Sequence, residues 1–208
     1  MLGIHDFSAF LLSSIILVIL PGQDSLYIMG RSIAQGRRAG LASVAGITTG
    51  LSIHLTAAVL GISAILAAYP AAFYAVKLAG ALYLVYLGAR MLLSRSSGVA
   101  IDAKHEDSGF SACYRQGFLS NILNPKVALF YIAFMPQFIA TNSPHRTIAF
   151  LVLGTIFYVM GTLWNTMLAW FASMLGNWMR RNTSFANTIN RSAGALFVFL
   201  GIKIAITK

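Results

Sequence analysis

The stretch Leu20-Pro21-Gly22-Gln23-Asp24 interrupts an apolar run that begins at Phe7 and resumes after the interruption. A helix over the full run, about 24 residues, would be roughly 36 Å long and could cross a bilayer. Pro21 removes a backbone donor and clashes with the preceding turn, and Gly22 loosens the backbone further. Asp24 places a carboxyl group near the middle of the span, where an ionised group is costly and usually functional. The stretch predicts either a broken helix at a transporter substrate site or a proline kink beside a structurally paired acid.

The composition supports a membrane protein. Of 208 residues, 58% are hydrophobic and only 10% are charged, and the mean hydropathy is +0.75, whereas a soluble domain carries about 25% charged residues. The net charge of +10 does not indicate nucleic-acid binding, because the basic residues lie in short segments between apolar runs. The single cysteine, the scattered histidines and the absence of a phosphate-binding glycine loop predict no disulfide, metal, cofactor or ATP site. Nor is a nucleophile visible at membrane depth, so we expect a protein that is not an enzyme.

The apolar runs predict an all-α integral membrane protein with six transmembrane helices, of which the first and fourth are broken. Residues 1–93 form the first three-span repeat, 94–109 a polar cytoplasmic linker and 110–208 the second repeat, within one transmembrane domain. The expected spans are about 7–30, 40–67, 71–93, 112–139, 146–176 and 188–206.

Loop charge predicts the orientation. The segments after the first, third and fifth spans carry most of the basic residues, and the opposite side carries few, which is a positive-inside pattern. Both termini are therefore expected to face the periplasm or outside, and the three basic segments to face the cytoplasm. The basic residues on the expected cytoplasmic side are Arg31, Arg37, Arg38, Arg90, Arg95, Lys104, Arg115, Arg180, Arg181 and Arg191, against Arg146, Lys203 and Lys208 on the other side.

The two halves resemble each other. Lys77-Leu78-Ala79-Gly80-Ala81-Leu82 opens the third span, and Arg191-Ser192-Ala193-Gly194-Ala195-Leu196 opens the sixth. The first and fourth spans are both interrupted, at Pro21-Gly22 and at Asn124-Pro125. Because each half has an odd number of spans, the second half must be inverted, and inverted repeats with matching broken helices indicate a secondary transporter.

The second interruption, Asn124-Pro125-Lys126, lies within an otherwise apolar run. Asn is a favoured N-cap and Pro a favoured first helical residue, so a new half-helix is expected to start here. Its N-terminal amides and the Lys126 ammonium would attract an anionic group such as a carboxylate. The alternative is a kink with Lys126 reaching toward the interface.

Asp24 is the only acidic residue in the predicted spans, and its candidate partners are Lys126 and Lys77. It could carry a proton or act as the counter-ion for a substrate ammonium group. His54, in the middle of the second span, is either a proton relay or a hydrogen-bonded packing residue. Lys77 is either a ligand or an interfacial anchor. Gly46 and Gly50 form a G-x-x-x-G pair, for which close helix packing is the favoured role.

These residues resemble the LysE/RhtB family of bacterial amino-acid exporters over nearly the whole chain. The most specific run contains Asn121 and leads into the second break: Gly117-Phe118-Leu119-Ser120-Asn121-Ile122-Leu123-Asn124-Pro125-Lys126. The chain departs from the family at Gln23, where members usually have a second proline. The resemblance carries site roles to Pro21, Gly22, Asp24, Asn124, Pro125 and Lys126.

The resemblance implies export of amino acids from the cytoplasm, driven by the proton gradient. We expect small, neutral substrates such as threonine, homoserine or leucine-like compounds, with protons and membrane lipid as the other partners and possible homo-oligomers. A metal or ion exporter on a related scaffold and a passive channel are the alternatives. An ion exporter would require more converging ligands than Asp24 and His54, and channel flux would not depend on the proton gradient.

Overall fold

The computed structural model describes residues 2–68, 109–140 and 143–181, with the backbone alone at 62–68 and 173–181, together with single positions between 78 and 93 and between 188 and 202. Within these residues the chain is helical, and its elements follow the order predicted from the sequence. The predicted third and sixth spans, the linker at 94–108 and Lys77 lie largely or wholly outside the described residues. The elements are α1 (Phe7–Ile19), α2 (Gln23–Gln35), α3 (Arg37–Ala68), α5 (Phe110–Ile122), α6 (Pro125–Leu129), the π-helix η1 (Phe130–Phe134), the 3₁₀-helix η2 (Met135–Phe138) and α7 (Arg146–Arg181).

The first span is broken where the sequence predicts it. Helix α1 ends at Ile19, α2 begins at Gln23, and the two axes are bent by 42°. Pro21 cannot donate to the helical ladder, and Gly22 adopts an extended conformation as the N-cap of α2. Gln23 is therefore the first helical residue of α2, a position where proline is favoured but not required. This position explains why a glutamine in place of the usual second proline leaves the break intact.

The second break has a similar form. Helix α5 ends at Ile122, the continuation begins at Pro125, and the bend between them is 46°. Asn124 caps the new helix, because its side-chain oxygen accepts from the backbone N–H of Lys126 at 3.0 Å. The prediction of a half-helix beginning at Asn124-Pro125 is confirmed. The helical run then passes into the π-helix η1 and the 3₁₀-helix η2, which contains Pro136 and ends at Phe138.

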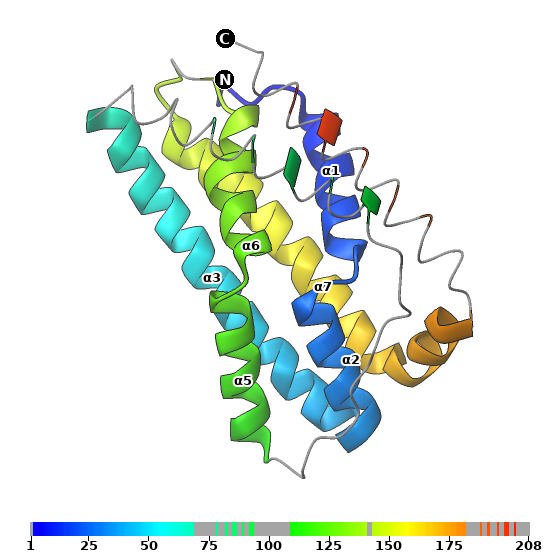
Figure 1. Cartoon of the computed structure of the whole chain (residues 1–208). Helices are drawn as coiled ribbons and strands as arrows, with labels where there is room; N and C mark the ends of the chain where they lie inside the picture. Colours follow the sequence, from blue (N-terminus) through cyan, green and yellow to red (C-terminus); the bar gives the residue numbers. More distant parts are fainter. Residues whose placement is uncertain are drawn as a thin grey trace.

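Each half of the described chain consists of a bent helix pair followed by one long helix. Figure 1 shows that α1 and α2 run toward one end of the molecule and α3 runs back, whereas α5 and α6 run in the opposite direction to α1 and α2, and α7 opposite to α3. Helix α3 packs against both α5 and α7, and α2 packs against α3, α5 and α7. The two halves are therefore interleaved, and both breaks lie at the middle of the bundle.

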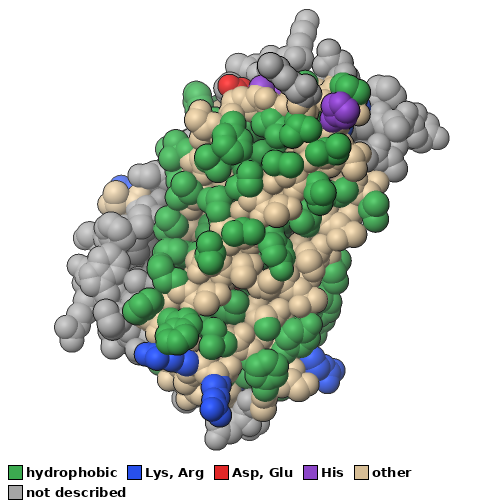
Figure 2. All heavy atoms as spheres, turned by 180° about the vertical axis from the view of Figure 1, so that it is seen from behind, with side chains coloured by type: hydrophobic (Ala, Val, Ile, Leu, Met, Phe, Trp, Pro, Cys, Tyr) green, Lys and Arg blue, Asp and Glu red, His purple; other side chains and the backbone are tan. Residues whose placement is uncertain are grey.

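By length and composition, two described helices can cross a membrane, and up to four spans result if each bent pair counts as one. The two are Arg37–Gly61 and Arg146–Ala172, with mean hydropathies of 1.5 and 1.8. Hydrophobic side chains are spread over the whole middle of the face shown in Figure 2, between an end with Lys and Arg side chains and an end with Asp and His side chains. This distribution matches a bundle whose lateral surface contacts lipid.

The charge pattern suggested that Arg31 lies in a loop, but the structure places it inside a helix. Helix α2 continues to Gln35, and only Gly36, with a φ of 82°, separates it from α3. Because a left-handed φ suits glycine, this turn can be one residue long. Arg31 consequently lies inside α2 with 2% of its surface exposed, whereas Arg37 and Arg38 are exposed at the basic end. Arg115 likewise lies inside α5 and Arg180 and Arg181 inside α7.

Close packing between α3 and α5 depends on glycine. A Cβ atom at Gly46 would overlap the backbone of Tyr114 and Phe118, and one at Gly117 would lie 2.5 Å from the carbonyl oxygen of Ser43. A Cβ atom at Gly50 would lie 2.6 Å from the side-chain oxygen of Asn121. The packing role favoured for Gly46 and Gly50 is confirmed, and it brings Asn121 against α3.

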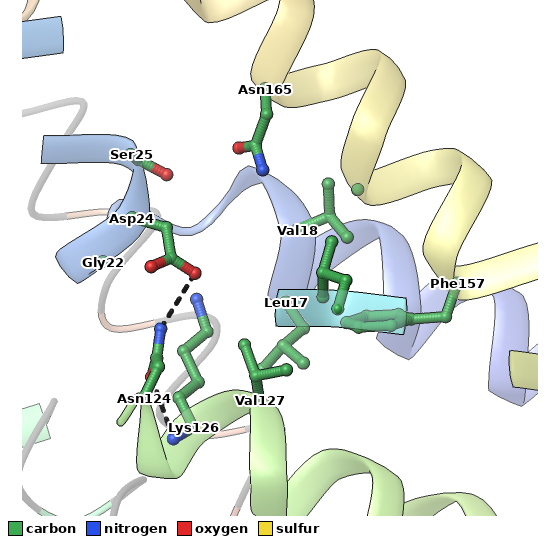
Figure 3. Close-up of a pocket in the computed structure, with 12 residues that line it drawn as sticks. Leu17, Val18, Gly22, Asp24, Ser25, Asn124, Lys126, Val127, Phe157 and Asn165 are labelled. Carbon is green, nitrogen blue, oxygen red and sulfur yellow. Dashed lines mark hydrogen bonds between the residues drawn. The ribbon is translucent and has the colours of Figure 1, made fainter. Parts of the chain in front are cut away.

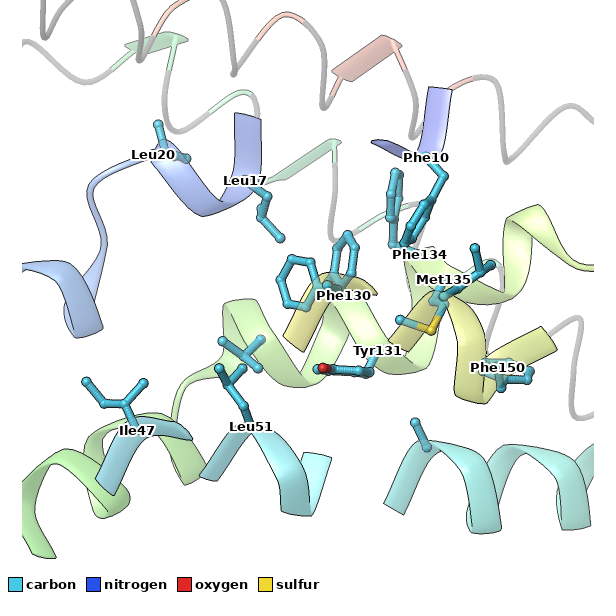
Figure 4. Close-up of a cluster of buried hydrophobic side chains, with 14 of the residues drawn as sticks. Phe10, Leu17, Leu20, Ile47, Leu51, Phe130, Tyr131, Phe134, Met135 and Phe150 are labelled. Atoms are coloured by element: carbon cyan, nitrogen blue, oxygen red, sulfur yellow. The ribbon is translucent and has the colours of Figure 1, made fainter. Parts of the chain in front are cut away.

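The largest cluster of buried hydrophobic residues in the described chain includes a group of aromatic residues that follows the second break (Figure 4). Phe130 of η1 stacks on Phe157 of α7 with ring centroids 3.9 Å apart. Phe10 of α1 packs edge-on against Phe138 of η2 at 5.4 Å. The cluster thus joins α1, α7 and the irregular part of the second broken helix.

The N-terminal residues also hold this region. Ile4 pairs with Ile139 in an antiparallel bridge, the His5 amide donates to the Phe138 carbonyl at 3.0 Å, and the Ala140 amide donates to the Gly3 carbonyl at 2.8 Å. The segment before α1 is thereby fixed to the last residue of η2 and to the two residues that follow it.

Candidate functional site

A cavity lies where the two broken helices meet, and its polar side is formed by both of them. Figure 3 shows Asp24 and Ser25 from α2 beside Asn124 and Lys126 from the second break, with Asn165 of α7 completing the polar side. The sequence placed Asp24 and Lys126 in separate spans, and the fold brings them to one cavity. Asn165 comes from α7, the long helix of the second half.

The other side of the cavity is apolar. Leu17 and Val18 come from the last turn of α1, Leu51 from α3, Val127 from α6 and Phe157 from α7. In Figure 3 Leu17, Val18 and Phe157 lie across the cavity from Asp24. A ligand in this cavity would meet charged and amide groups at one side and hydrocarbon at the other.

Asp24 accepts hydrogen bonds from three side chains, two of them in α5 and the third at the N-cap of α6. The donors are the Asn121 amide at 2.7 Å, the Asn124 amide at 3.0 Å and the Ser120 hydroxyl at 3.2 Å. Asp24 also lies in the first turn of α2, where the helix dipole favours a negative charge. The carboxylate is therefore held in place by neutral donors rather than by a basic side chain.

Lys126 connects one break to the other. Its ammonium group donates to the backbone carbonyl of Leu20 at 3.1 Å, a carbonyl at the end of α1 that an unbroken helix would have paired with the Asp24 amide. Among the described residues, no ion pair within 4.0 Å joins Lys126 to Asp24. The ammonium group has three donors, so it can bind the carbonyl and still offer N–H groups to a ligand.

Asn124 has two roles at once. Its side-chain oxygen caps α6, and its side-chain amide donates to Asp24. The same residue thus fixes where the half-helix starts and how the acid is oriented. Asn124 is 5% exposed and Asn121 is fully buried. The Asn121 side-chain amide donates to Asp24, whereas its side-chain oxygen is buried without a partner.

His54 lies behind the cavity rather than in it. Its Nε2 donates to the backbone carbonyl of Asn121 at 3.0 Å, and its ring stacks on Tyr131 with centroids 6.4 Å apart. Since the side chain of Asn121 donates to Asp24, His54 and the acid are connected through one residue. This geometry is compatible with both interpretations of His54, as a relay and as a packing residue.

Of the remaining predicted residues, Gly22 is part of the cavity lining, whereas Pro21, Gln23 and Pro125 shape the site without lining it. Pro21 and Pro125 lie at the breaks, and Gln23 is exposed at the start of α2. Gly22 lies against Lys126, whose ammonium nitrogen would be 3.3 Å from a Cβ atom at that position. Among the described residues, no group of three or more His, Cys, Asp or Glu side chains is placed to hold a metal ion.

Sequence reasoning missed Ser120 and Ser25 as site residues. Ser120 precedes Asn124 by four residues and donates to Asp24. The i, i+4 spacing of polar residues on the α5 run could have indicated a shared face. Ser25 lines the cavity but is distinguished in the sequence only by following Asp24.

Replacing Asn124 by Ala is expected to lower the free energy of unfolding by about 1 kcal/mol, the usual cost of losing an N-cap. It should also slow transport, because Asp24 loses one of its three donors. Asn124→Ser is the matched variant, since serine can cap the helix but lacks the amide that reaches Asp24. Thermal unfolding in detergent and initial transport rates separate the two roles. Equal stability of the Ala and Ser variants would contradict the capping role.

The fold and this cavity define a class: helical membrane proteins in which two broken helices meet around a polar cavity. The chain belongs to the LysE type translocator family, whose model matches residues 15–208. This is a family of transport proteins rather than enzymes.

The relatives match the chain over nearly its whole length. It is 31% identical to an uncharacterized membrane protein, YrhP, of Bacillus subtilis, over 98% of this chain and 100% of the relative. It is 32% identical to an uncharacterized membrane protein, PA4757, of Pseudomonas aeruginosa, over 98% and 96%. It is 26% identical to a leucine efflux protein of Salmonella typhimurium, over 98% and 96%. No solved structure matches the chain.

Proposed function

We propose that this protein is a secondary transporter that exports small neutral amino acids from the cytoplasm, driven by the proton gradient. The observation that carries the proposal is that Asp24 and Lys126, one from each broken helix, both line the polar side of a cavity whose other side is apolar. A zwitterionic amino acid with a hydrocarbon side chain carries an ammonium group that can pair with Asp24 and a carboxylate that can pair with Lys126. Its side chain can contact the apolar side of the cavity.

The substrate ammonium group is placed at Asp24 and its carboxylate near Lys126 and Asn124. Charge-assisted hydrogen bonds of this kind are about twice as strong as neutral ones. The substrate side chain then lies against Val18, Val127 and Phe157. Among threonine, homoserine and leucine-like compounds, this apolar side favours leucine-like ones, in agreement with the name of the leucine efflux relative.

Proton coupling is assigned to Asp24. A proton from the outer side would neutralise the carboxylate and release the substrate ammonium group, and loss of the proton would restore the empty site. In this cycle the Asp24 carboxylate binds either a proton or the substrate ammonium group, but not both at once. His54 supports this site through Asn121, because it donates to the Asn121 carbonyl while the Asn121 side chain donates to Asp24.

The opposed directions of the two halves support an inverted-repeat mechanism. Each half contributes one broken helix to the cavity, so rocking one half against the other would expose the cavity to alternate sides. The basic end of the bundle is assigned to the cytoplasm of a bacterial inner membrane, with the N-terminus in the periplasm. The third and sixth spans complete the two repeats in this proposal.

The test is uptake of radiolabelled amino acids into inverted membrane vesicles with an imposed proton gradient, where an exporter loads the vesicle. Accumulation of leucine or a similar amino acid that collapses with a protonophore is the expected result. Equilibration without accumulation, at a rate independent of the gradient, would indicate a passive channel. Absence of any amino-acid flux by folded protein would contradict the proposal and favour an ion exporter, to be tested with metal cations in the same vesicles.

A further inference from the structure

Arg31 is a buried cation whose hydrogen-bonding capacity is largely unused. Only 2% of its surface is exposed. One terminal nitrogen, Nη2, donates to the side-chain oxygen of Gln116, while Nε and Nη1 are buried without a partner. An arginine carries five N–H donors and cannot lose its charge at ordinary pH.

Nothing in the described part of the chain neutralises this charge. No carboxylate of the described residues lies within 4.0 Å of the guanidinium group. The Tyr27 ring, 5.5 Å from the guanidinium carbon, supplies a cation–π contact that replaces only part of the lost hydration. A buried, uncompensated charge is strongly unfavourable, so a group that can pair with it is expected to bind.

The position of Arg31 relates it to the cavity. Arg31 follows Asp24 by seven residues on α2, which places both on one face of the helix, about 10 Å apart along its axis. Tyr27 lies between them, and its hydroxyl donates to the Cys113 carbonyl at 3.1 Å and to Gln116 at 3.3 Å. All three residues of α2 face α5, so a polar strip extends from the cavity toward the basic end of the bundle.

The strip is accessible at its outer part. Gln116, the partner of Arg31, is exposed although Arg31 is not. A small anion approaching from the basic end would reach Gln116 first, and rotation of that side chain would open the guanidinium group. The exposed Arg37 and Arg38 give this end a positive field that attracts anions.

We propose that Arg31, with Gln116 and Tyr27, forms an entry site that binds the carboxylate of the exported amino acid before it reaches Asp24 and Lys126. The inference rests on the proposed export function for the identity of the ligand. The substrate carboxylate is bound twice in succession, first at Arg31 and then at Lys126, while its ammonium group becomes paired only at Asp24.

Binding is tested on the purified full-length protein in detergent, using isovalerate and its uncharged amide. Isovalerate has the hydrocarbon chain and carboxylate of leucine without the ammonium group. A Lys126→Gln background removes the other cation. We expect isovalerate, but not its amide, to raise the unfolding temperature of the Lys126→Gln variant. We expect this stabilisation to be lost in the double variant Arg31→Gln/Lys126→Gln.

Transport kinetics give a second readout that does not depend on the Lys126 variant. Arg31→Gln should raise the KM for leucine about tenfold or more, the value of one charge-assisted hydrogen bond, with little change in maximal rate. Arg31→Lys should restore part of the affinity. Arg115→Gln is the matched control, because Arg115 is an exposed arginine beside Gln116 and its KM should stay within twofold of the wild type.

Three outcomes would overturn the entry site. They are isovalerate stabilisation unaffected by Arg31→Gln, no isovalerate effect in the Lys126→Gln variant, and isovalerate binding that appears only after Asp102, Glu106 and Asp107 are neutralised. The last would mean that acids of this chain occupy the guanidinium group. If isovalerate binding depends on Arg31 but the wild-type protein transports no amino acid, the export function is refuted and the anion site remains. If the protein exports amino acids and Arg31→Gln leaves the KM unchanged, only the entry site is refuted.

Discussion

Asp24→Asn is expected to reduce proton-driven leucine accumulation by roughly 100-fold, the scale associated with removing one partner of a buried charged pair. The substitution removes the negative charge that pairs with the substrate ammonium group and the atom that takes the proton. It also places an amide opposite Asn121 and Asn124, two donors that now point at the Asp24 carboxylate. The measurement is the initial rate of uptake into inverted vesicles, with protein content and thermal unfolding determined on the same preparation.

Asp6→Asn is the matched control, because Asp6 is the other described acid and lies exposed before α1. Its φ of 49° is tolerated by asparagine, so neither transport nor stability should change. Asp24→Glu keeps the charge but displaces it, and is expected to retain partial coupling. Full accumulation by Asp24→Asn would exclude Asp24 as the proton carrier and the ammonium partner.

Gly46→Ala is expected to lower the free energy of unfolding by about 1–3 kcal/mol, the cost of overpacking a close contact. The added Cβ atom would overlap backbone atoms of Tyr114 and Phe118, which cannot rotate away as a flexible side chain can. The helices α3 and α5 would have to separate, and Asn121 would move with α5. Thermal unfolding in detergent should therefore show a lower midpoint, and leucine uptake should fall because Asp24 loses its alignment.

Gly61→Ala is the control in the same helix. Nothing lies within 4 Å of a Cβ atom at Gly61, so alanine should leave stability unchanged or raise it by up to about 1 kcal/mol through its greater helix propensity. Equal midpoints for Gly46→Ala and Gly61→Ala would show that the close approach of α3 and α5 is not needed for stability.

The sequence was sufficient to predict the broken helices and the long ones between them. Proline and glycine act on their own backbone, so the breaks at Pro21-Gly22 and Asn124-Pro125 could be located to within a residue or two. The long apolar runs predicted α3 and α7 because a bilayer sets the length of a spanning helix. The linker boundaries and the third and sixth spans remain predictions.

The site could be predicted in part. A charged residue inside an apolar span is visible in the sequence, which is why Asp24 and Lys126 were identified. Their actual partners were not, since Asp24 binds Ser120, Asn121 and Asn124 rather than Lys126. Which neutral donors surround an acid depends on the relative rotation of α2 and α5, and this rotation follows from tertiary packing rather than from local sequence.

Arg31 shows the same limit. In the sequence it precedes Arg37 and Arg38 and looks like one more basic loop residue. Helix α2 continues past the predicted end of the span to Gln35 and ends at Gly36, so Arg31 lies inside the helix and is buried. The charge pattern alone does not distinguish a buried arginine from a surface one.

The pairing of Gly3–His5 with Phe138–Ala140 has a practical consequence for labelling. An affinity tag or fluorescent protein fused before Met1 would be attached next to backbone hydrogen bonds that end on the second broken helix, which also carries Asn124 and Lys126. Drag or steric load on such a fusion would act on this helix directly. Reporters placed at the N-terminus should therefore be introduced through a long flexible spacer, and their effect on uptake compared with that of an untagged protein.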